Sequence, residues 1–174
     1  MRIGFMGAAS GEKGFGEFLK IAREAAGPGV EFHAVGRLGV DMVGEDLGVL
    51  TTRPLTAGKV ERAEYVERLA RMHYVCMPYG AAHYRYSPSG VLADALALAR
   101  PVLAFDLPIF RDLFDRFGDI GHMCRNAEEM AELIQVGGLG DENRYRGQVA
   151  AMRAAREPRL AGRLKDDLRM ALGA

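Results

Sequence analysis

The first fifteen residues, 1-MRIGFMGAASGEKGF-15, decide the fold class. An apolar run at 3–6 stops at the small residues 7–11, which is typical of a buried strand that ends in a glycine-rich turn. Apolar residues then recur at three- and four-residue intervals over 15–26, the spacing of an amphipathic helix, until Gly-Pro-Gly at 27–29 ends it. The chain therefore opens with a strand, a turn and a helix.

The same alternation continues along the chain. Strands are predicted over 30–35, 73–77, 101–105 and 120–123, and helices over 61–70, 91–99, 108–114 and, after an N-cap pattern at Asn126, to about 134. Alternating strands and helices imply right-handed crossovers, so we expect an α/β fold with a doubly wound, mainly parallel sheet and helices on both faces. Ligands of such sheets bind beyond the carboxyl ends of the strands. That rule selects the loops 7–14, 36–41, 78–90 and 106–108.

Length and composition indicate one globular domain. The 174 residues are 49% hydrophobic and 26% charged, which excludes disorder for the bulk of the chain. We expect a single domain over 1–174, with a core at about 1–135 and two amphipathic helices at about 140–173 that are separated at Pro158. The 23 basic and 23 acidic side chains cancel, so no broad attraction to nucleic acid or to an anionic membrane is expected.

Neither the cysteines nor the N-terminus indicates secretion. Cys76 and Cys124 are far apart and outside any metal-ligand spacing, so we expect neither a disulfide framework nor a bound metal. The apolar stretch after Met1 is too short for a signal sequence or a bilayer span. The sequence therefore predicts a cytoplasmic protein without a transmembrane segment.

The turn at 7–14, Gly-Ala-Ala-Ser-Gly-Glu-Lys-Gly, is the first candidate binding site. Gly7 lets the backbone approach a ligand closely, and Lys13 places a cation at the start of a helix, which together suit a phosphate. The order of glycine, lysine and hydroxyl is not that of a Walker loop. The alternative is a turn that only connects a strand to a helix and leaves Lys13 in solvent.

The segment 87–94 is the second candidate. Ser87 or Ser89 is placed to cap a helix that begins near Gly90, and the free amide groups of such a helix end favour a diphosphate; an ordinary capped helix is the alternative. Asp94 is the one charge in an otherwise apolar stretch, which predicts a fully buried helix whose acid needs a polar ligand or a hydrogen-bonding partner. No serine–histidine or cysteine–histidine spacing marks a catalytic pair, so no catalytic residue is assigned.

Three stretches of the sequence form a pattern that known proteins share. Residues 6–15 read MGAASGEKGF, residues 65–78 read YVERLARMHYVCMP, and residues 90–104 read GVLADALALARPVLA. Between about Ile3 and Ile134 the chain thereby resembles the C-terminal, nucleotide-sugar-binding domain of the retaining glycosyltransferases of the GT-B fold, the group 1 family that includes relatives of glycogen synthase. The resemblance implies a Rossmann-like half of such an enzyme and a nucleotide-diphosphate sugar as donor substrate, with no separate cofactor.

The resemblance also implies roles for individual residues. Lys13 matches the lysine that neutralises the donor diphosphate, and Asp94 matches the second glutamate of a pair, which holds ribose hydroxyls. Gly7 lies in the family's first turn, and the backbone cradle for phosphate matches Ser87, Ser89, Gly90 and Val91. A cation and a helix N-terminus stabilise a leaving nucleoside diphosphate without a metal.

The sequence departs from the family pattern at four positions. It carries Ala8 in place of an arginine, Tyr86 in place of the first glutamate, Asp94 in place of the second, and Arg100 in place of a glycine. Arg85 or Arg37 is a hypothetical replacement for the lost positive charge, and Tyr86 is a candidate for stacking on a sugar or a base. The chain is therefore predicted either to bind an unusual donor or to have lost transfer activity.

These features together predict the donor-binding domain of a retaining glycosyltransferase. Because the first strand begins at Met1, transfer is expected to need a separate or missing acceptor domain, so the expected partners are a nucleotide sugar and either that domain or a second copy of the chain. The alternative is a catalytically degenerate nucleotide-binding or scaffold module of the same fold. A flavodoxin-like or receiver-type signalling domain is a weaker rival, since the acidic cluster of a receiver is missing after the first strand.

Overall fold

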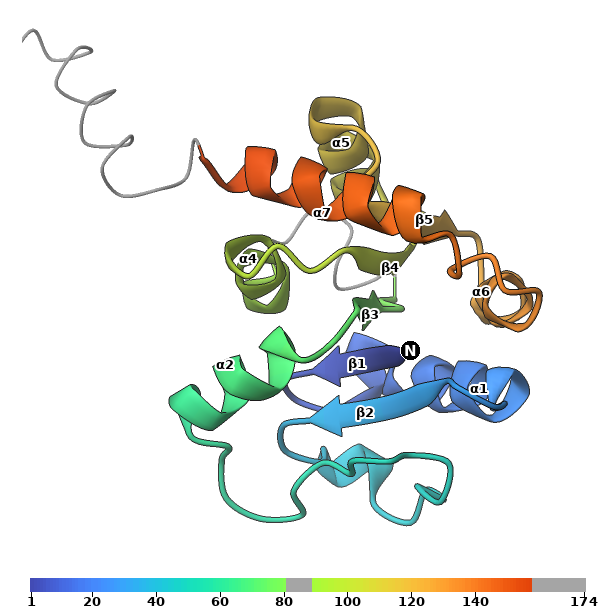
Figure 1. Cartoon of the computed structure of the whole chain (residues 1–174). Coiled ribbons are helices and arrows are strands. Elements are labelled where there is room, and N and C mark those ends of the chain that lie inside the picture. Colours follow the sequence, from blue (N-terminus) through green and yellow to red (C-terminus); the bar gives the residue numbers. More distant parts are fainter. Residues whose placement is uncertain (81–88, 158–174) are drawn as a thin grey trace, which may run out of the picture.

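The protein is built on one parallel sheet, seen in a computed structural model that describes residues 1–80 and 89–157 (Figure 1). Its order is β2-β1-β3-β4-β5, and all four pairings are parallel. The strands are β1 (Arg2–Met6), β2 (Glu31–Val35), β3 (Tyr74–Met77), β4 (Val102–Phe105) and β5 (Gly121–Cys124). The predicted parallel sheet is therefore confirmed.

Helices cover both faces of this sheet. The α-helices are α1 (Phe15–Ala25), α2 (Arg62–Ala70), α4 (Gly90–Ala97), α5 (Pro108–Phe117), α6 (Ala127–Gln135) and α7 (Glu142–Arg156), and the 3-10 helices are η1 (Gly11–Lys13) and η2 (Val40–Met42). Figure 1 shows α1 and α6 on one side, with α2 and α4 on the other. The apolar side chains of α5 and α7 join the core on the side of α2 and α4. This arrangement confirms the doubly wound α/β fold.

Alternation along the strands produces two separate cores. In β1, Ile3 and Phe5 belong to the core under α1 and α6, whereas Met6 belongs to the core under α4. This follows because successive side chains of a strand point to opposite faces of the sheet. The Phe5 ring centroid lies 5.1 Å from that of Phe15 and 5.3 Å from that of Phe18. Because a fully buried phenylalanine contributes roughly 1.5–3 kcal/mol, these rings hold α1 on the sheet.

Residues 51–55 add a rudimentary sixth strand beside β2. The Ala34 amide donates to the Thr52 carbonyl at 2.8 Å, and the Leu55 amide donates to the Gly36 carbonyl at 2.7 Å. Two isolated parallel bridges accompany these bonds. With this segment included, the order matches that of the dinucleotide-binding fold, in which the third strand lies at the edge. The sequence pattern does not predict this segment, because two bridges need no alternating run of apolar residues.

The structure corrects one expectation about α4. Gly90, Ala93 and Ala97 are exposed, so this helix is not fully buried. Its apolar composition is misleading because the exposed stripe consists of glycine and alanine, while the larger side chains face the sheet.

Helix α7 is the first of the two predicted C-terminal helices. It packs against α4, where the Arg156 guanidinium donates to the Ala97 carbonyl at 3.0 Å. The second predicted helix, after Pro158, lies outside the described residues. In the described part of the chain, no helix has both the length and the apolar character needed to cross a membrane.

Candidate functional site

The direction of winding changes between β1 and β3. β1 pairs with β2 on one side and with β3 on the other, so the chain order runs outward both ways from this point. In doubly wound sheets, ligands bind in the crevice outside the carboxyl ends of the strands at such a position. Gly7 follows β1 and Pro78 follows β3 at this edge, within two of the loops that the sequence selects.

Gly14 holds the turn after β1 against the end of β3. Its φ is 71°, in the left-handed region, and a Cβ at this position would lie 1.8 Å from the carbonyl oxygen of Pro78. Only glycine therefore lets the start of α1 approach β3 so closely. This contact fixes the turn that carries Lys13 beside the crevice.

Lys13, Gly7 and Val91 meet at one point of the crevice. A Cβ on Gly7, whose φ is 91°, would lie 3.3 Å from Lys13 Nζ and 3.3 Å from Val91 Cγ2. The turn after β1 and the first turn of α4 thus flank the same space, although they are far apart in the sequence. The structure brings these three predicted site residues together.

Lys13 is a partly buried cation. Burial lowers the pKa of its ammonium group, because desolvation disfavours the charged form. Within residues 1–80 and 89–157, this ammonium forms no hydrogen bond or ion pair. An anion bound beside Lys13 would therefore replace interactions that the ammonium loses on leaving water.

The N-cap residue of α4 forms no side-chain cap. Ser89 is the N-cap residue, but its hydroxyl lies 3.0 Å from the hydroxyl of Tyr79 and accepts from no helix amide. The expected cap is therefore wrong for Ser89, because a buried tyrosine competes for the serine oxygen. Apart from its own neighbours in the chain, no residue that the structure describes has an atom within 4 Å of the Cβ position of Gly90, so none of them blocks the first amide groups of α4 from an anion.

The Asp94 carboxylate is bound by Arg62, at the start of α2. The two terminal nitrogens of Arg62 donate to the two carboxylate oxygens at 2.9 and 2.5 Å. The side chain of Asp94 is 20% exposed and that of Arg62 is 67% exposed. Of the two kinds of partner expected for this acid, the structure shows a protein group. No local signal in the sequence identifies Arg62, because the pair spans 32 positions.

A second acid, Asp41, occupies part of the glycine-rich turn. The Gly11 amide donates to Asp41 Oδ2 at 2.7 Å and is therefore not available to a ligand. Arg37 is exposed at the same edge, where its carbonyl accepts from the Ala9 amide at 2.8 Å, and it stays a candidate for the missing positive charge. The predicted site residues Arg85, Tyr86 and Ser87 lie outside the described residues.

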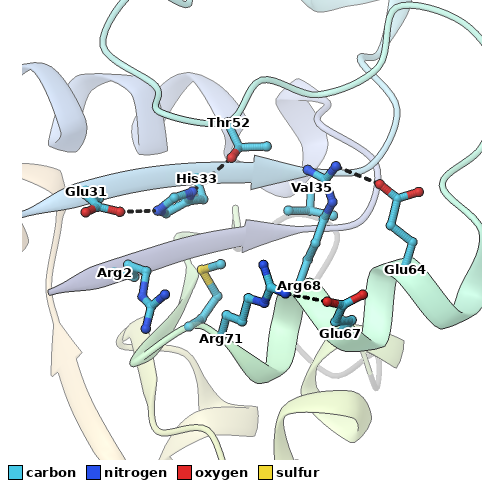
Figure 2. A pocket seen from close by; sticks show the side chains of 10 residues that line it. Arg2, Glu31, His33, Val35, Thr52, Glu64, Glu67, Arg68 and Arg71 are labelled. Carbon is cyan, nitrogen blue, oxygen red and sulfur yellow. Dashed lines mark hydrogen bonds and ion pairs between the residues drawn. The ribbon is translucent and has the colours of Figure 1, made fainter.

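Two cavities lie away from the crevice, and neither is lined by a predicted site residue. A groove of about 430 Å³ lies between α2 and the strands β1 and β2 (Figure 2). Six of its ionic side chains are paired, as Figure 2 shows: Arg68 with Glu64, Arg71 with Glu67, and His33 with Glu31. A hollow of about 490 Å³ lies beside β5 and includes His122. Among the residues that the structure describes, no group of three or more His, Cys, Asp or Glu is arranged to hold a metal ion.

Comparison with known proteins identifies the fold. No family model and no curated protein sequence matches the chain. The C-terminal domain of a glycosyl transferase group 1 family protein, LpcC from Francisella tularensis, matches with a TM-score of 0.65 at 14% identity, over 90% of this chain and 84% of that chain. The catalytic domain of cholesterol-α-glucosyltransferase from Helicobacter pylori matches with a TM-score of 0.62 at 16% identity, over 90% of this chain and 98% of that chain.

A third solved structure extends beyond this chain. Anabaena HepE in complex with UDP matches with a TM-score of 0.70 at 16% identity, over 99% of this chain and 48% of that chain. The present chain therefore spans about half the length of HepE. The resemblance that the sequence indicates is confirmed at the level of the fold: the chain is folded as the C-terminal domain of a group 1 glycosyltransferase of the GT-B type.

Proposed function

We propose that the chain binds the nucleotide-diphosphate sugar donor of a retaining glycosyltransferase reaction. The observation that carries this proposal is the meeting of Lys13 with the first turn of α4 beside Gly7. A cation and an accessible helix N-terminus at one point suit a diphosphate, which carries several negative charges. The complexes of HepE with UDP and with UDP-glucose support this class of ligand, since HepE shares the fold.

The site is suited to stabilise the leaving group. When the bond between the sugar and the diphosphate breaks, the nucleoside diphosphate leaves with the bonding electrons, and negative charge grows on its oxygens. The Lys13 ammonium and the amide groups of Gly90 and Val91 stabilise that charge. Both sets of donors are positioned before a ligand arrives, the first by the Gly14 turn and the second by the helix, so little reorganisation is needed.

Asp94 and the acceptor have separate roles in this proposal. A carboxylate has about four lone-pair sites, so Asp94 retains the capacity to accept a ribose hydroxyl while it is bound to Arg62. The domain that binds the acceptor substrate belongs to another part of the enzyme or to another chain, because this chain corresponds to about half of HepE. Localisation in the cytoplasm, where activated sugars are available, is part of the same proposal.

Specific features also favour a second candidate function, that of a nucleotide-binding or scaffold module without transfer activity. Ala8 stands where the family has an arginine. The Gly11 amide is taken by Asp41, and the Asp94 carboxylate is paired with Arg62. The first and last of these features remove or occupy contacts that the resemblance assigns to the donor, and the Asp41 bond occupies an amide of the glycine-rich turn.

Titration calorimetry with UDP, ADP and GDP tests donor binding. We expect at least one nucleotide to bind saturably to the wild-type protein. We expect Lys13→Ala to weaken that binding roughly tenfold or more, since a hydrogen bond to a charged group contributes about 1.5–3 kcal/mol. Lys20→Ala is the matched control, because Lys20 pairs with Glu128 on the surface. Absence of heat with all three nucleotides would contradict donor binding and favour the scaffold function.

A further inference from the structure

Arg62 presents much of its guanidinium group at the surface. Its two terminal nitrogens donate to Asp94, and its guanidinium carbon lies 5.3 Å from the centroid of the Tyr65 ring. A guanidinium has five N–H donors, so the pair with Asp94 uses only some of them. Because 67% of the Arg62 side chain is exposed, the remaining donors are accessible to a ligand.

The pair with Asp94 fixes this guanidinium close to the start of α4. Asp94 lies one helical turn after Gly90, about 6 Å along the helix axis. α2 leads into β3 and α4 leads into β4, and both strands belong to the parallel sheet, so both helices begin at the carboxyl edge of that sheet. Arg62 is the first residue of α2 and therefore lies on the same edge as Lys13.

We propose that Arg62 is the second cation of the donor site and contacts a phosphate oxygen of the bound nucleotide. This inference rests on the proposed function, because it assigns Arg62 to the same diphosphate as Lys13. In this proposal Arg62 supplies the positive charge that the family's arginine provides and that Ala8 cannot. The sequence alone suggests Arg85 or Arg37 for this role.

The charges around the start of α4 explain why a second cation is needed. By itself, Asp94 places a negative charge one helical turn from the expected diphosphate and would repel it. Arg62 cancels that charge, and its free donors add attraction to a phosphate. The planar fork of a guanidinium matches the spacing of phosphate oxygens, which an ammonium does not. Lys13 and Arg62 together therefore outweigh the charge of Asp94 at the start of α4, while the Asp41 carboxylate is bound to the Gly11 amide in the neighbouring turn.

A competing interpretation assigns the opposite effect to the same contact. The Arg62 fork occupies a lone pair on each oxygen of Asp94. If this occupation blocked the acceptance of ribose hydroxyls, removal of Arg62 would free these two lone pairs of Asp94, which is also hydrogen-bonded to Tyr65, and would strengthen nucleotide binding. The two interpretations predict changes of opposite sign, and a ligand without ribose separates them.

The experiment is calorimetric titration with inorganic pyrophosphate and with the nucleoside diphosphate that binds best among UDP, ADP and GDP. We expect Arg62→Ala to weaken the binding of both ligands about tenfold, the loss of one hydrogen bond to a charged group. Arg62→Lys should retain part of the affinity, because it keeps the charge and loses the fork. The loss should shrink at high salt, since the guanidinium is exposed.

Arg71→Ala is the matched control. The Arg71 side chain is 64% exposed and pairs with Glu67 at the other end of α2, so its removal should leave both affinities unchanged. Thermal unfolding checks that each variant is folded, and Arg62→Lys carries the same test if Arg62→Ala does not fold.

The outcomes separate this inference from the proposed function. If Arg62→Ala binds both ligands as tightly as the wild type, or binds the nucleotide more tightly, the role of Arg62 is overturned. Donor binding still stands in that case if Lys13→Ala weakens the binding of the same ligands. If the wild-type protein binds neither pyrophosphate nor any of the three nucleotides, both proposals are overturned.

Discussion

At the scale of single residues, Lys13 and His122 show two consequences of burying a basic group. Burial lowers the pKa of both. His122 Nε2 lies 3.2 Å from the side-chain nitrogen of Gln148, an amide nitrogen that cannot accept, so this ring nitrogen carries no proton and the imidazole is neutral. The Lys13 ammonium forms no such bond among the described residues. The same physical effect therefore indicates a structural role for His122 and underlies the binding role that we propose for Lys13.

His122 should make stability depend on pH below neutrality. Burial lowers its pKa from 6.5 to about 4, so between these values the unfolded chain binds a proton that the folded chain does not. The stability contributed by the neutral imidazole is complete above about pH 6.5 and is lost as the pH falls toward 4. Between pH 7 and 4.5, we expect His122→Gln to lose about 2 kcal/mol less of its unfolding free energy than the wild type. Urea unfolding at both pH values measures this, and equal losses would contradict it.

At the scale of elements, local sequence patterns predict whether a segment is a strand or a helix and where it begins. The apolar run at 3–6, which stops at a glycine-rich turn, predicts a buried strand, and β1 is that strand. Asn126 Oδ1 accepts from the Glu129 amide at 2.9 Å, so the predicted start of α6 is confirmed. The burial of α4 could not be predicted, because alanines such as Ala93 suit an exposed stripe as well as a buried one.

Contacts between elements account for the parts of the site that sequence could not predict. The residue types and sequence neighbours of Lys13 and Asp94 are enough to predict that these two residues suit the binding of a nucleotide-sugar donor. Which groups face them depends on packing: Val91 lies beside Gly7 and Lys13, and Arg62 lies beside Asp94, only because α2 and α4 begin at the same edge of the sheet. No spacing within one element encodes either contact.

The contact between the η1–α1 turn and β3 should be sensitive to one methyl group. Gly14→Ala would place a Cβ 1.8 Å from the Pro78 carbonyl oxygen at a φ of 71°. We expect it to lower the free energy of unfolding by roughly 2–4 kcal/mol, because the backbone must move. Gly27→Ala is the matched control, since no other part of the described chain lies within 4 Å of its Cβ position. Urea denaturation of both variants measures the difference, and similar midpoints would show that the turn adapts without strain.

At the scale of the whole molecule, the sheet acts as a rigid base that gathers distant segments at one edge. The turn after β1, the start of α2 and the start of α4 all reach this edge. Most of the chain forms the support for a few polar groups, which is typical of sites on doubly wound sheets. Ligand binding at the edge should therefore be linked to the stability of the entire fold.

A bound nucleotide should stabilise the whole domain. A ligand that binds only the folded state adds about 2.7 kcal/mol to the free energy of unfolding at a hundredfold excess over its Kd. We expect the best-binding nucleotide to raise the urea midpoint of the wild-type protein, and to raise that of Lys13→Ala less at the same concentration. Lys20→Ala should respond as the wild type does. An unchanged wild-type midpoint at saturating nucleotide would contradict specific binding.

The sheet separates two apolar clusters that share no side chain. Phe5 and Phe15 belong to one cluster, and Met77 and Phe110 belong to the other. Substitutions on opposite sides are held apart by the backbone between them, so their energetic costs should add without epistasis. Evolution can therefore replace one layer while the other is unchanged. Such independent drift gives a physical reason why this architecture persists between proteins that are 14–16% identical.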